Sequence, residues 1–285
     1  MGSYDFFEKS VSSRFFITGN AGFIGKWLMK ETNAFGFDAK DCDIRNYDLL
    51  KKKIISAKPT HLIHLAAIAN PEVCEKNPNL AWDVNVTGTE NILKICEEQG
   101  IKATIMSTAQ VYKEKNAPLN ESNELKDSGS VYVNTKIECE KLAKEYGSTI
   151  IRAFNQEGPN RPAEYFTSKA ILSCINNDSL KLWNPNQVRE YMDVRDGAKG
   201  IHLISLKGKG IFNLSTGRGI SKLEYVKLVE KVLNKKINYS VEKNENKSVI
   251  VGDNSRLREL GWVQDCLLEK TIFDQAETLK SQFIF

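Results

Sequence analysis

Between residues 18 and 25 the chain reads Thr18-Gly19-Asn20-Ala21-Gly22-Phe23-Ile24-Gly25. A short apolar run over 14–18 precedes these glycines and a helical pattern over 23–33 follows them, which predicts a strand, a turn and a helix. Glycines in such a turn let a pyrophosphate approach the backbone, and the helix N-terminus offers free N–H groups to the anion. The first gap is one residue longer than in the usual dinucleotide fingerprint, so a purely structural glycine turn stays open at this point.

Strands and helices continue to alternate along the first half of the chain. Further strands are expected at 35–38, 60–65 and 102–106, and helices at 51–57 and 82–99. This alternation predicts an α/β fold in which helices cover both faces of a doubly wound parallel sheet. A ligand of such a sheet binds at the carboxyl ends of the strands.

Asp38 follows the second expected strand, 19 residues after Gly19. A carboxylate at this place commonly binds a ribose hydroxyl of the cofactor, and an ordinary loop acid is the alternative. The side chain favours NAD, whereas Lys40 could accept the 2′-phosphate of NADP. The cofactor is therefore expected to be NAD or NADP, with NAD slightly favoured.

Composition excludes several classes of protein. The chain has 285 residues and a net charge of +4, from 40 Lys and Arg against 36 Asp and Glu. This length suits one large α/β unit or two lobes. The basic runs are short and broken by acids, so we expect no nucleic-acid partner. Apolar runs stay well short of the roughly 20 residues that a membrane span requires, and the N-terminus lacks the pattern of a signal peptide.

Cysteine and histidine usage indicates neither a disulfide framework nor a metal site. The six cysteines are widely spaced and form no Cys-x-x-Cys pair. His64 follows an apolar strand, so we expect it to be a hydrogen-bonded structural residue and not a metal ligand. This usage favours the cytoplasm, with no bound metal.

Tyr132 and Lys136 stand four residues apart in a segment of helical character. Residues at this spacing share one helix face, so the phenol and the ammonium can point into one cleft. The ammonium is expected to lower the pKa of the phenol toward the range of a general acid or base. Thr108, at the end of the fourth strand, would add a hydroxyl at the same sheet edge. A surface pair on a helix is the alternative for Tyr132 and Lys136 alone.

A series of segments between residues 14 and about 262 resembles, in the same order, the extended short-chain dehydrogenase/reductase family that acts on nucleotide sugars. The resemblance implies a Rossmann-type fold with a small, discontinuous substrate lobe. The segments are Thr18-Gly19-x-x-Gly22-Phe23-Ile24-Gly25, Asp43-Ile44-Arg45, His64-Leu65-Ala66-Ala67, Asn85-Val86-x-Gly88-Thr89, Ser107-Thr108-x-x-Val111-Tyr112, Tyr132-x-x-x-Lys136, Arg152-x-Phe154-Asn155-x-x-Gly158-Pro159, Arg189 to Asp196 and Leu260-Gly261-Trp262.

The resemblance also implies roles for individual residues. The catalytic set would be Thr108, Tyr132 and Lys136. The nucleotide-diphosphate sugar would contact Thr108, Asn155 and Arg189, whose guanidinium suits a phosphate. The cofactor would contact Gly19, Gly22, Phe23, Ile24, Gly25, Asp38, Asp43, Ile44, Leu65, Ala66, Ala67, Asn85, Tyr132 and Lys136.

The resemblance favours an oxidoreductase that acts at carbon 4 of a nucleotide-diphosphate sugar and is most similar to the 4-keto-6-deoxy-sugar reductases. The alternative is a 4-epimerase or 4-dehydrogenase that retains NAD. A 4,6-dehydratase is disfavoured because Ala109 and Gln110 stand where those enzymes carry acids. A dinucleotide-binding protein without turnover also stays open, although it would not need Tyr132.

The same resemblance predicts how the chain is divided. Residues 12–155 and 188–215 are expected to form the dinucleotide-binding domain, and 156–187 and 216–285 the substrate lobe. Helices are expected at 164–175 and 225–233 in that lobe, which is short for the family. The resemblance further implies a homodimer, formed through a helix pair that includes the helix of Tyr132.

Overall fold

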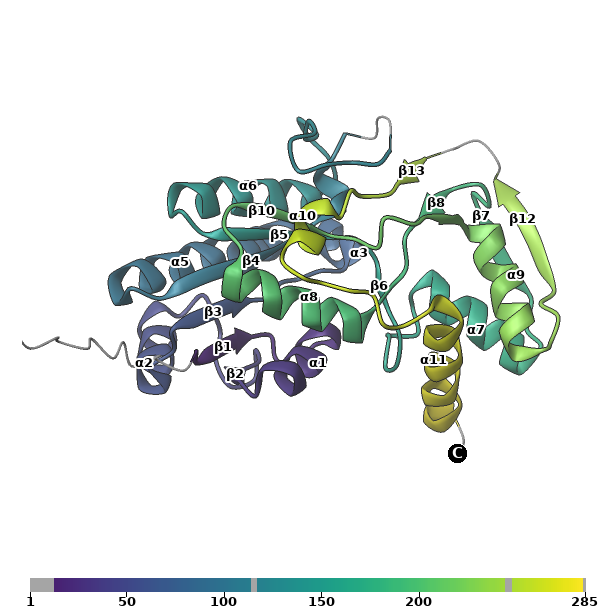
Figure 1. Cartoon of the computed structure of the whole chain (residues 1–285), viewed down its shortest axis with the longest axis horizontal. Coiled ribbons are helices and arrows are strands. Elements are labelled where there is room, and N and C mark those ends of the chain that lie inside the picture. Colours follow the sequence, from purple (N-terminus) through teal and green to yellow (C-terminus); the bar gives the residue numbers. More distant parts are fainter. Residues whose placement is uncertain (1–12, 114–116, 244–247, 284–285) are drawn as a thin grey trace, which may run out of the picture.

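The computed structural model describes residues 13–113, 117–243 and 248–283. Its centre is a six-stranded parallel sheet in the order β10-β5-β4-β3-β1-β2 (Figure 1). The six strands are β1 (Phe15–Thr18), β2 (Phe35–Phe37), β3 (His61–His64), β4 (Lys102–Thr108), β5 (Thr149–Ala153) and β10 (Ile211–Leu214). The chain crosses over on each side of β1, as a doubly wound sheet requires. The predicted fold class is confirmed, and β4 extends two residues past the expected end at Met106.

Helices cover both faces of this sheet. The helices concerned are α1 (Phe23–Thr32), α2 (Tyr47–Ala57), α5 (Gly88–Gln99), α6 (Val131–Glu145) and α8 (Val194–Lys207). On one face Phe16 packs in a core with residues of α2, α5 and α6. On the other, Phe15 and Ile17 pack with residues of α1 and α8. Successive strand residues point to opposite faces, so β1 is buried on both sides, and its first three residues are all apolar.

The helix predicted over 82–99 is interrupted in the structure. Short helices α3 (Pro71–Lys76) and α4 (Pro78–Trp82) lead into a π-helical turn, η1 (Asp83–Thr87), and only then into α5. Prolines stand at the first turns of α3 and α4, where a missing N–H costs no hydrogen bond. The π-turn places Asn85 inside the protein, where it meets the helix α6.

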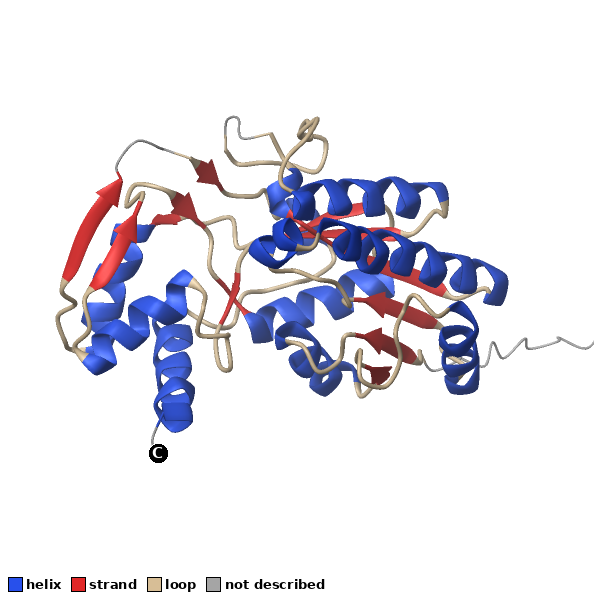
Figure 2. Cartoon of the chain, turned by 180° about the vertical axis from the view of Figure 1, so that it is seen from behind, coloured by secondary structure: helices blue, strands red, loops and turns tan. Residues whose placement is uncertain are grey.

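A second group of elements lies beside the carboxyl edge of the sheet (Figure 2). It has its own apolar core around Tyr225 and Ile272. The helix α9 begins three residues earlier than predicted, because Ser221 and Glu224 form a capping box. The elements are β6 (Gln156–Glu157), α7 (Phe166–Asn176), β7 (Leu180–Trp183), β8 (Val188–Arg189), β9 (Met192–Asp193), β11 (Ile220–Ser221), α9 (Lys222–Leu233), β12 (Tyr239–Lys243), β13 (Val249–Ile250) and α11 (Leu268–Phe283). The short helix α10 (Ser255–Glu259) instead contacts β10, and its Leu257 packs in the core of the large sheet.

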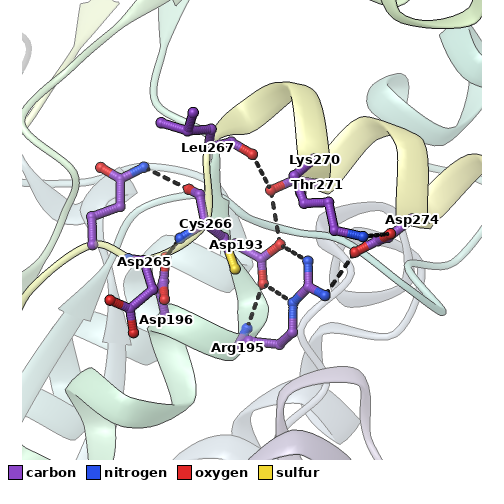
Figure 3. Close-up of polar contacts among 10 residues, drawn as sticks. Asp193, Arg195, Asp196, Asp265, Cys266, Leu267, Lys270, Thr271 and Asp274 are labelled. Carbon is purple, nitrogen blue, oxygen red and sulfur yellow. Dashed lines mark hydrogen bonds and ion pairs between the residues drawn. The ribbon is translucent and has the colours of Figure 1, made fainter.

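A polar network ties α11 to the start of α8 (Figure 3). Asp193 caps α8 and accepts hydrogen bonds from Arg195 and from the Thr271 hydroxyl, the latter at 2.8 Å. Arg195 also pairs with Asp274 of α11 at 2.7 Å. Trp262, ahead of α11, packs in the core of the large sheet. The predicted division of the chain stays a prediction, and this packing places part of the 216–285 segment against the large sheet.

No helix within the described ranges combines the length and the apolar composition needed to cross a bilayer.

Candidate active site

The glycine turn after β1 has the shape that a pyrophosphate requires. Gly19 has φ +74°, and a Cβ there would lie 2.9 Å from the Ala66 nitrogen. A Cβ on Gly25 would lie 2.2 Å from the Gly19 carbonyl oxygen, so α1 packs directly on the turn. Gly22 caps α1 without a side chain, and the first turn of α1, which includes Phe23 and Ile24, carries no acid. The free N–H groups and the absence of negative charge fit a phosphate of the cofactor.

The ends of β1 and β3 are tied together beside this turn. The Leu65 N–H donates to the Thr18 carbonyl at 3.2 Å, and the Ala66 N–H to the Thr18 hydroxyl at 3.3 Å. His64 is buried between the hydroxyls of Thr18 at 2.7 Å and Thr89 at 3.1 Å. Burial lowers the pKa of His64 to about 3, so the ring is neutral. This confirms the expected structural role of His64, and Leu65, Ala66 and Ala67 follow it at the sheet edge.

The two carboxylates predicted to contact the cofactor, Asp38 and Asp43, have different surroundings. Asp38 directly follows Phe37, whose carbonyl accepts the Gly19 N–H at 2.9 Å, so its half-buried side chain lies beside the turn. Asp43 is exposed and binds Arg45 at 2.6 Å, which lowers the pKa of this carboxylate. Contact of either with the cofactor stays a prediction.

Ile44 and Asn85 have structural contacts that the sequence did not indicate. Ile44 is buried against Gly88, where a Cβ would lie 2.4 Å from the Ile44 Cδ1. The Asn85 amide accepts from the Ile68 N–H at 2.8 Å and donates to the Thr135 hydroxyl at 3.0 Å. Asn85 therefore holds the segment after β3 against α6, and its predicted place near the adenine is untested.

The three predicted catalytic residues lie together where β4 ends and α6 begins. Ser130 caps α6 by accepting the Val133 N–H, which fixes the first turn that carries Tyr132. The Thr108 side chain lies close enough to the Tyr132 phenol to lower its pKa. One helical turn further on, the Lys136 ammonium donates to the Met106 carbonyl at 2.9 Å. Tyr132 and Lys136 are both buried, so the alternative of a surface pair is wrong.

The expected lowering of the tyrosine pKa by the lysine is also wrong for this arrangement. Burial raises the pKa of the Tyr132 phenol to about 12, and the neighbouring Thr108 side chain offsets part of the rise. Burial also lowers the pKa of the Lys136 ammonium. The ammonium binds the Met106 carbonyl and not the phenol, so desolvation has the larger effect on Tyr132. The phenol is thus a proton donor at neutral pH.

A buried ion pair behind the catalytic residues was missed by the sequence reasoning. Arg152 of β5 binds Glu140 of α6 through two nitrogens, at 2.9 and 2.7 Å. The Ser107 hydroxyl donates to the same carboxylate at 2.6 Å. Ser107 precedes Thr108, and Glu140 lies one turn after Lys136, so the pair fixes β4 against α6. The sign of this pair in the sequence was an ionisable residue at a position of β5 and of α6 that faces the protein interior.

A cavity of about 290 Å³ opens beside Thr108. It brings together the three residues predicted to contact the substrate, Thr108, Asn155 and Arg189. Gln110, Lys126 and Glu190 also line it. Nothing in the sequence pattern indicated that Lys126 would reach this cavity, because a long irregular segment separates it from Thr108.

Arg189 is hydrogen-bonded to neighbouring residues on its own side of the cavity. Its guanidinium donates to the Val188 carbonyl at 2.8 Å, and to the Ser248 carbonyl and hydroxyl at 3.0 Å each. The Asn155 carbonyl accepts the Met192 N–H at 2.9 Å, and Asn155 also lines the cavity. Pairing of Arg189 with a substrate phosphate stays a prediction.

Residues 15–215 match the model of the NAD dependent epimerase/dehydratase family. The UDP-glucuronate 4-epimerase of Thermodesulfobacterium geofontis is 27% identical in an alignment 263 positions long, gaps included, that covers 78% of this chain and 81% of the relative. The UDP-glucose 4-epimerase of Dictyostelium discoideum is 25% identical in an alignment 317 positions long that covers 88% of this chain and 91% of the relative.

Solved structures share the fold. The Thermus thermophilus UDP-glucose 4-epimerase in complex with NAD superposes with a TM-score of 0.83 at 21% identity, covering 94% of this chain and 99% of the other. The Pseudomonas aeruginosa protein RMD with NADPH gives a TM-score of 0.86 at 19% identity, covering 95% and 100%. The family model spans well over half of the chain and includes the glycine turn, Thr108, Tyr132 and Lys136. The chain is therefore an enzyme of the NAD-dependent epimerase/dehydratase family, of the extended short-chain dehydrogenase/reductase type, with a nicotinamide dinucleotide as its cofactor class.

Proposed function

We propose that this enzyme is a 4-epimerase of a nucleotide-diphosphate sugar that works with retained NAD. The observation that carries the proposal is the buried, neighbouring pair of Thr108 and Tyr132 beside a polar cavity at the carboxyl edge of the sheet. Relatives that align over most of their length are UDP-sugar 4-epimerases. They support the alternative weighed from the sequence better than the 4-keto-6-deoxy-sugar reductase favoured there.

The residues present can carry out the proton steps of this reaction. The Thr108 hydroxyl would position the oxygen on carbon 4 of the sugar, and Tyr132 would exchange a proton with that oxygen. When bound, the nicotinamide supplies the acceptor and donor of the hydride. Epimerisation needs Tyr132 first to take the proton as a phenolate and later to return it, with the 4-keto sugar presenting its other face in between. Because burial keeps the phenol protonated in the free protein, its pKa would have to be lowered by the positive charge of the bound nicotinamide. Ala109 and Gln110 offer no acid or base for the loss of water, which disfavours a 4,6-dehydratase.

The structure also supports a choice of cofactor and of nucleotide. Asp38 lies beside the glycine turn, and its carboxylate would repel the 2′-phosphate of NADP. Lys40 offers its backbone N–H to Asp38 at 2.8 Å. NAD is therefore our proposed cofactor, and UDP, the nucleotide in the names of the aligned relatives, our proposed carrier. The homodimer implied by the family resemblance is a further proposal, which light scattering tests.

The decisive test is turnover without added cofactor. The purified protein should release NAD or NADH on denaturation and should interconvert the carbon-4 epimers of a UDP-hexose in buffer alone. Tyr132→Phe should lower kcat by about 10²- to 10⁴-fold, because it removes the general acid and base. Tyr239→Phe, in the outer strand β12, is the matched control and should retain full activity. Net consumption of added NADH or NADPH by a 4-keto sugar, with no epimer formed, would instead establish the reductase.

A further inference from the structure

The cavity beside Thr108 contains a lysine whose ammonium has no acidic partner among the residues that the structure describes. Lys126 lines the cavity and is half-buried. Its ammonium makes no ion pair or hydrogen bond with any residue in the described parts of the chain. The neighbouring Lys113 differs, because it pairs with Glu124 at 2.7 Å and Asp127 at 2.8 Å. A half-buried ammonium without a partner is free to form a charge-assisted hydrogen bond with a ligand anion.

The backbone places Lys126 beside the reacting end of the cavity. The Thr108 hydroxyl accepts the Gln110 N–H at 3.3 Å and so begins the short turn over Ala109–Val111. The Lys126 N–H donates to the Val111 carbonyl at 2.8 Å. Lys126 is thus attached to the same turn that begins at Thr108, and Lys126, Gln110 and Thr108 line one side of the cavity.

The acid in this cavity is occupied by other donors. Glu190 accepts hydrogen bonds from the Ser215 hydroxyl at 2.7 Å and the Thr216 N–H at 2.6 Å, and a further one from the Gly252 N–H. It is almost completely buried in that network. Lys126 does not take part in it, so the Glu190 carboxylate is not the partner of the ammonium.

We propose that Lys126 binds a carboxylate on carbon 6 of the sugar, which would make a nucleotide-linked uronic acid the preferred substrate. This inference rests on the proposed function, because Thr108 and Tyr132 then hold the oxygen of carbon 4. The neighbours of that carbon are carbon 3, with a neutral hydroxyl, and carbon 5, which bears carbon 6. Of these positions only carbon 6 carries a carboxylate in a simple oxidised hexose. An ammonium beside a carboxylate forms a charge-assisted hydrogen bond, stronger than any it makes with a hydroxyl.

The test compares UDP-glucuronate with UDP-glucose in the full-length enzyme. Lys126→Met keeps the length of the side chain and removes its charge, and Lys126→Arg keeps the charge. We expect Lys126→Met to lower kcat/KM for UDP-glucuronate by about 10- to 100-fold. The kcat/KM for UDP-glucose should change by less than about twofold. Lys126→Arg should retain most of the preference for UDP-glucuronate over UDP-glucose. Lys231→Met, an exposed lysine of α9, is the control and should change neither value.

Each other outcome overturns the inference. An equal loss of kcat/KM for both sugars in Lys126→Met would mean that Lys126 binds the diphosphate or supports the fold. An unchanged kcat/KM for both sugars would mean that Lys126 contacts no substrate. A wild-type preference for UDP-glucose would also reject it. Calorimetric binding of the two sugars to Tyr132→Phe separates this inference from the proposed function. Tighter binding of the uronate that depends on Lys126 would stand even if the enzyme proved not to be an epimerase.

Discussion

Two walls of the candidate active site are built in different ways, and of the three predicted catalytic residues only Thr108 lines the cavity itself. Thr108, Tyr132 and Lys136 stand on β4 and α6, a seven-residue strand and a fifteen-residue helix. Arg189 and Ile250 of the opposite wall stand on β8 and β13, strands of two residues each. The wall of Thr108, Tyr132 and Lys136 is fixed by buried polar contacts, whereas the half-buried Arg189 is held by backbone carbonyls and the Ser248 hydroxyl, beside the buried network of Glu190. We expect the first wall to be rigid and the surroundings of Arg189 to be easier to remodel.

The buried pair of Arg152 and Glu140 is the strongest test of this contrast. Arg152→Met leaves the Glu140 carboxylate buried without its partner, and such a change typically costs about 3–5 kcal/mol of the free energy of unfolding. We expect a loss of this size in chemical denaturation, with a lower kcat because α6 is no longer fixed against β4. Arg189→Met on the opposite wall should cost far less, because its partners are backbone carbonyls and the Ser248 hydroxyl.

A second variant distinguishes lost charge from lost packing. In Arg152→Met/Glu140→Gln no uncompensated charge remains, and the stability should recover in part. If the double variant is no more stable than Arg152→Met, the arginine acts mainly through its packing on the Tyr112 ring, which lies 4.7 Å away.

Because His64 is buried and neutral, we expect the stability of the protein to fall in acid. Its pKa is about 3 in the folded protein, against an ordinary value of 6.5. As the pH falls below 6.5 the unfolded chain takes up a proton that the folded protein does not, so stability is lost on acidification. Between pH 7 and pH 5 this loss is about 2 kcal/mol. Urea unfolding of the wild type and of His64→Gln at pH 7 and pH 5 measures it as the difference between the two proteins. An equal loss in both would assign the acid sensitivity to other groups, such as His61.

The sequence was informative where local pattern and backbone geometry agree. The glycines of 18–25 and the four-residue spacing of Tyr132 and Lys136 were enough to predict the sheet, its ligand edge and the grouping of the catalytic residues. The environment of the tyrosine was predicted wrongly, because its pKa depends on how deeply α6 is buried and on where the Lys136 ammonium points. Neither property follows from spacing along one helix.

Long-range contacts explain what else was missed. Arg152, Glu140 and Ser107 meet only because β4, β5 and α6 pack together, and each looks unremarkable in its own segment. Lys126 reaches the cavity through a hydrogen bond between two loop segments, with no periodic pattern to predict it. Such contacts depend on tertiary packing and not on local propensity.

The smallest expected effect concerns the wall of short strands. Ser248→Ala removes one hydrogen bond, 3.0 Å long, to the half-buried Arg189 guanidinium, which keeps its two carbonyl partners. The free energy of unfolding should fall by at most about 1 kcal/mol. If Arg189 contacts the diphosphate, a looser guanidinium should raise KM a few-fold and leave kcat unchanged, because no proton-transferring group has moved. Steady-state kinetics at saturating sugar separates the two constants. A fall in kcat comparable to that of Arg152→Met would show that the two walls are mechanically coupled, and the contrast between a rigid catalytic wall and an adaptable recognition wall would then be wrong.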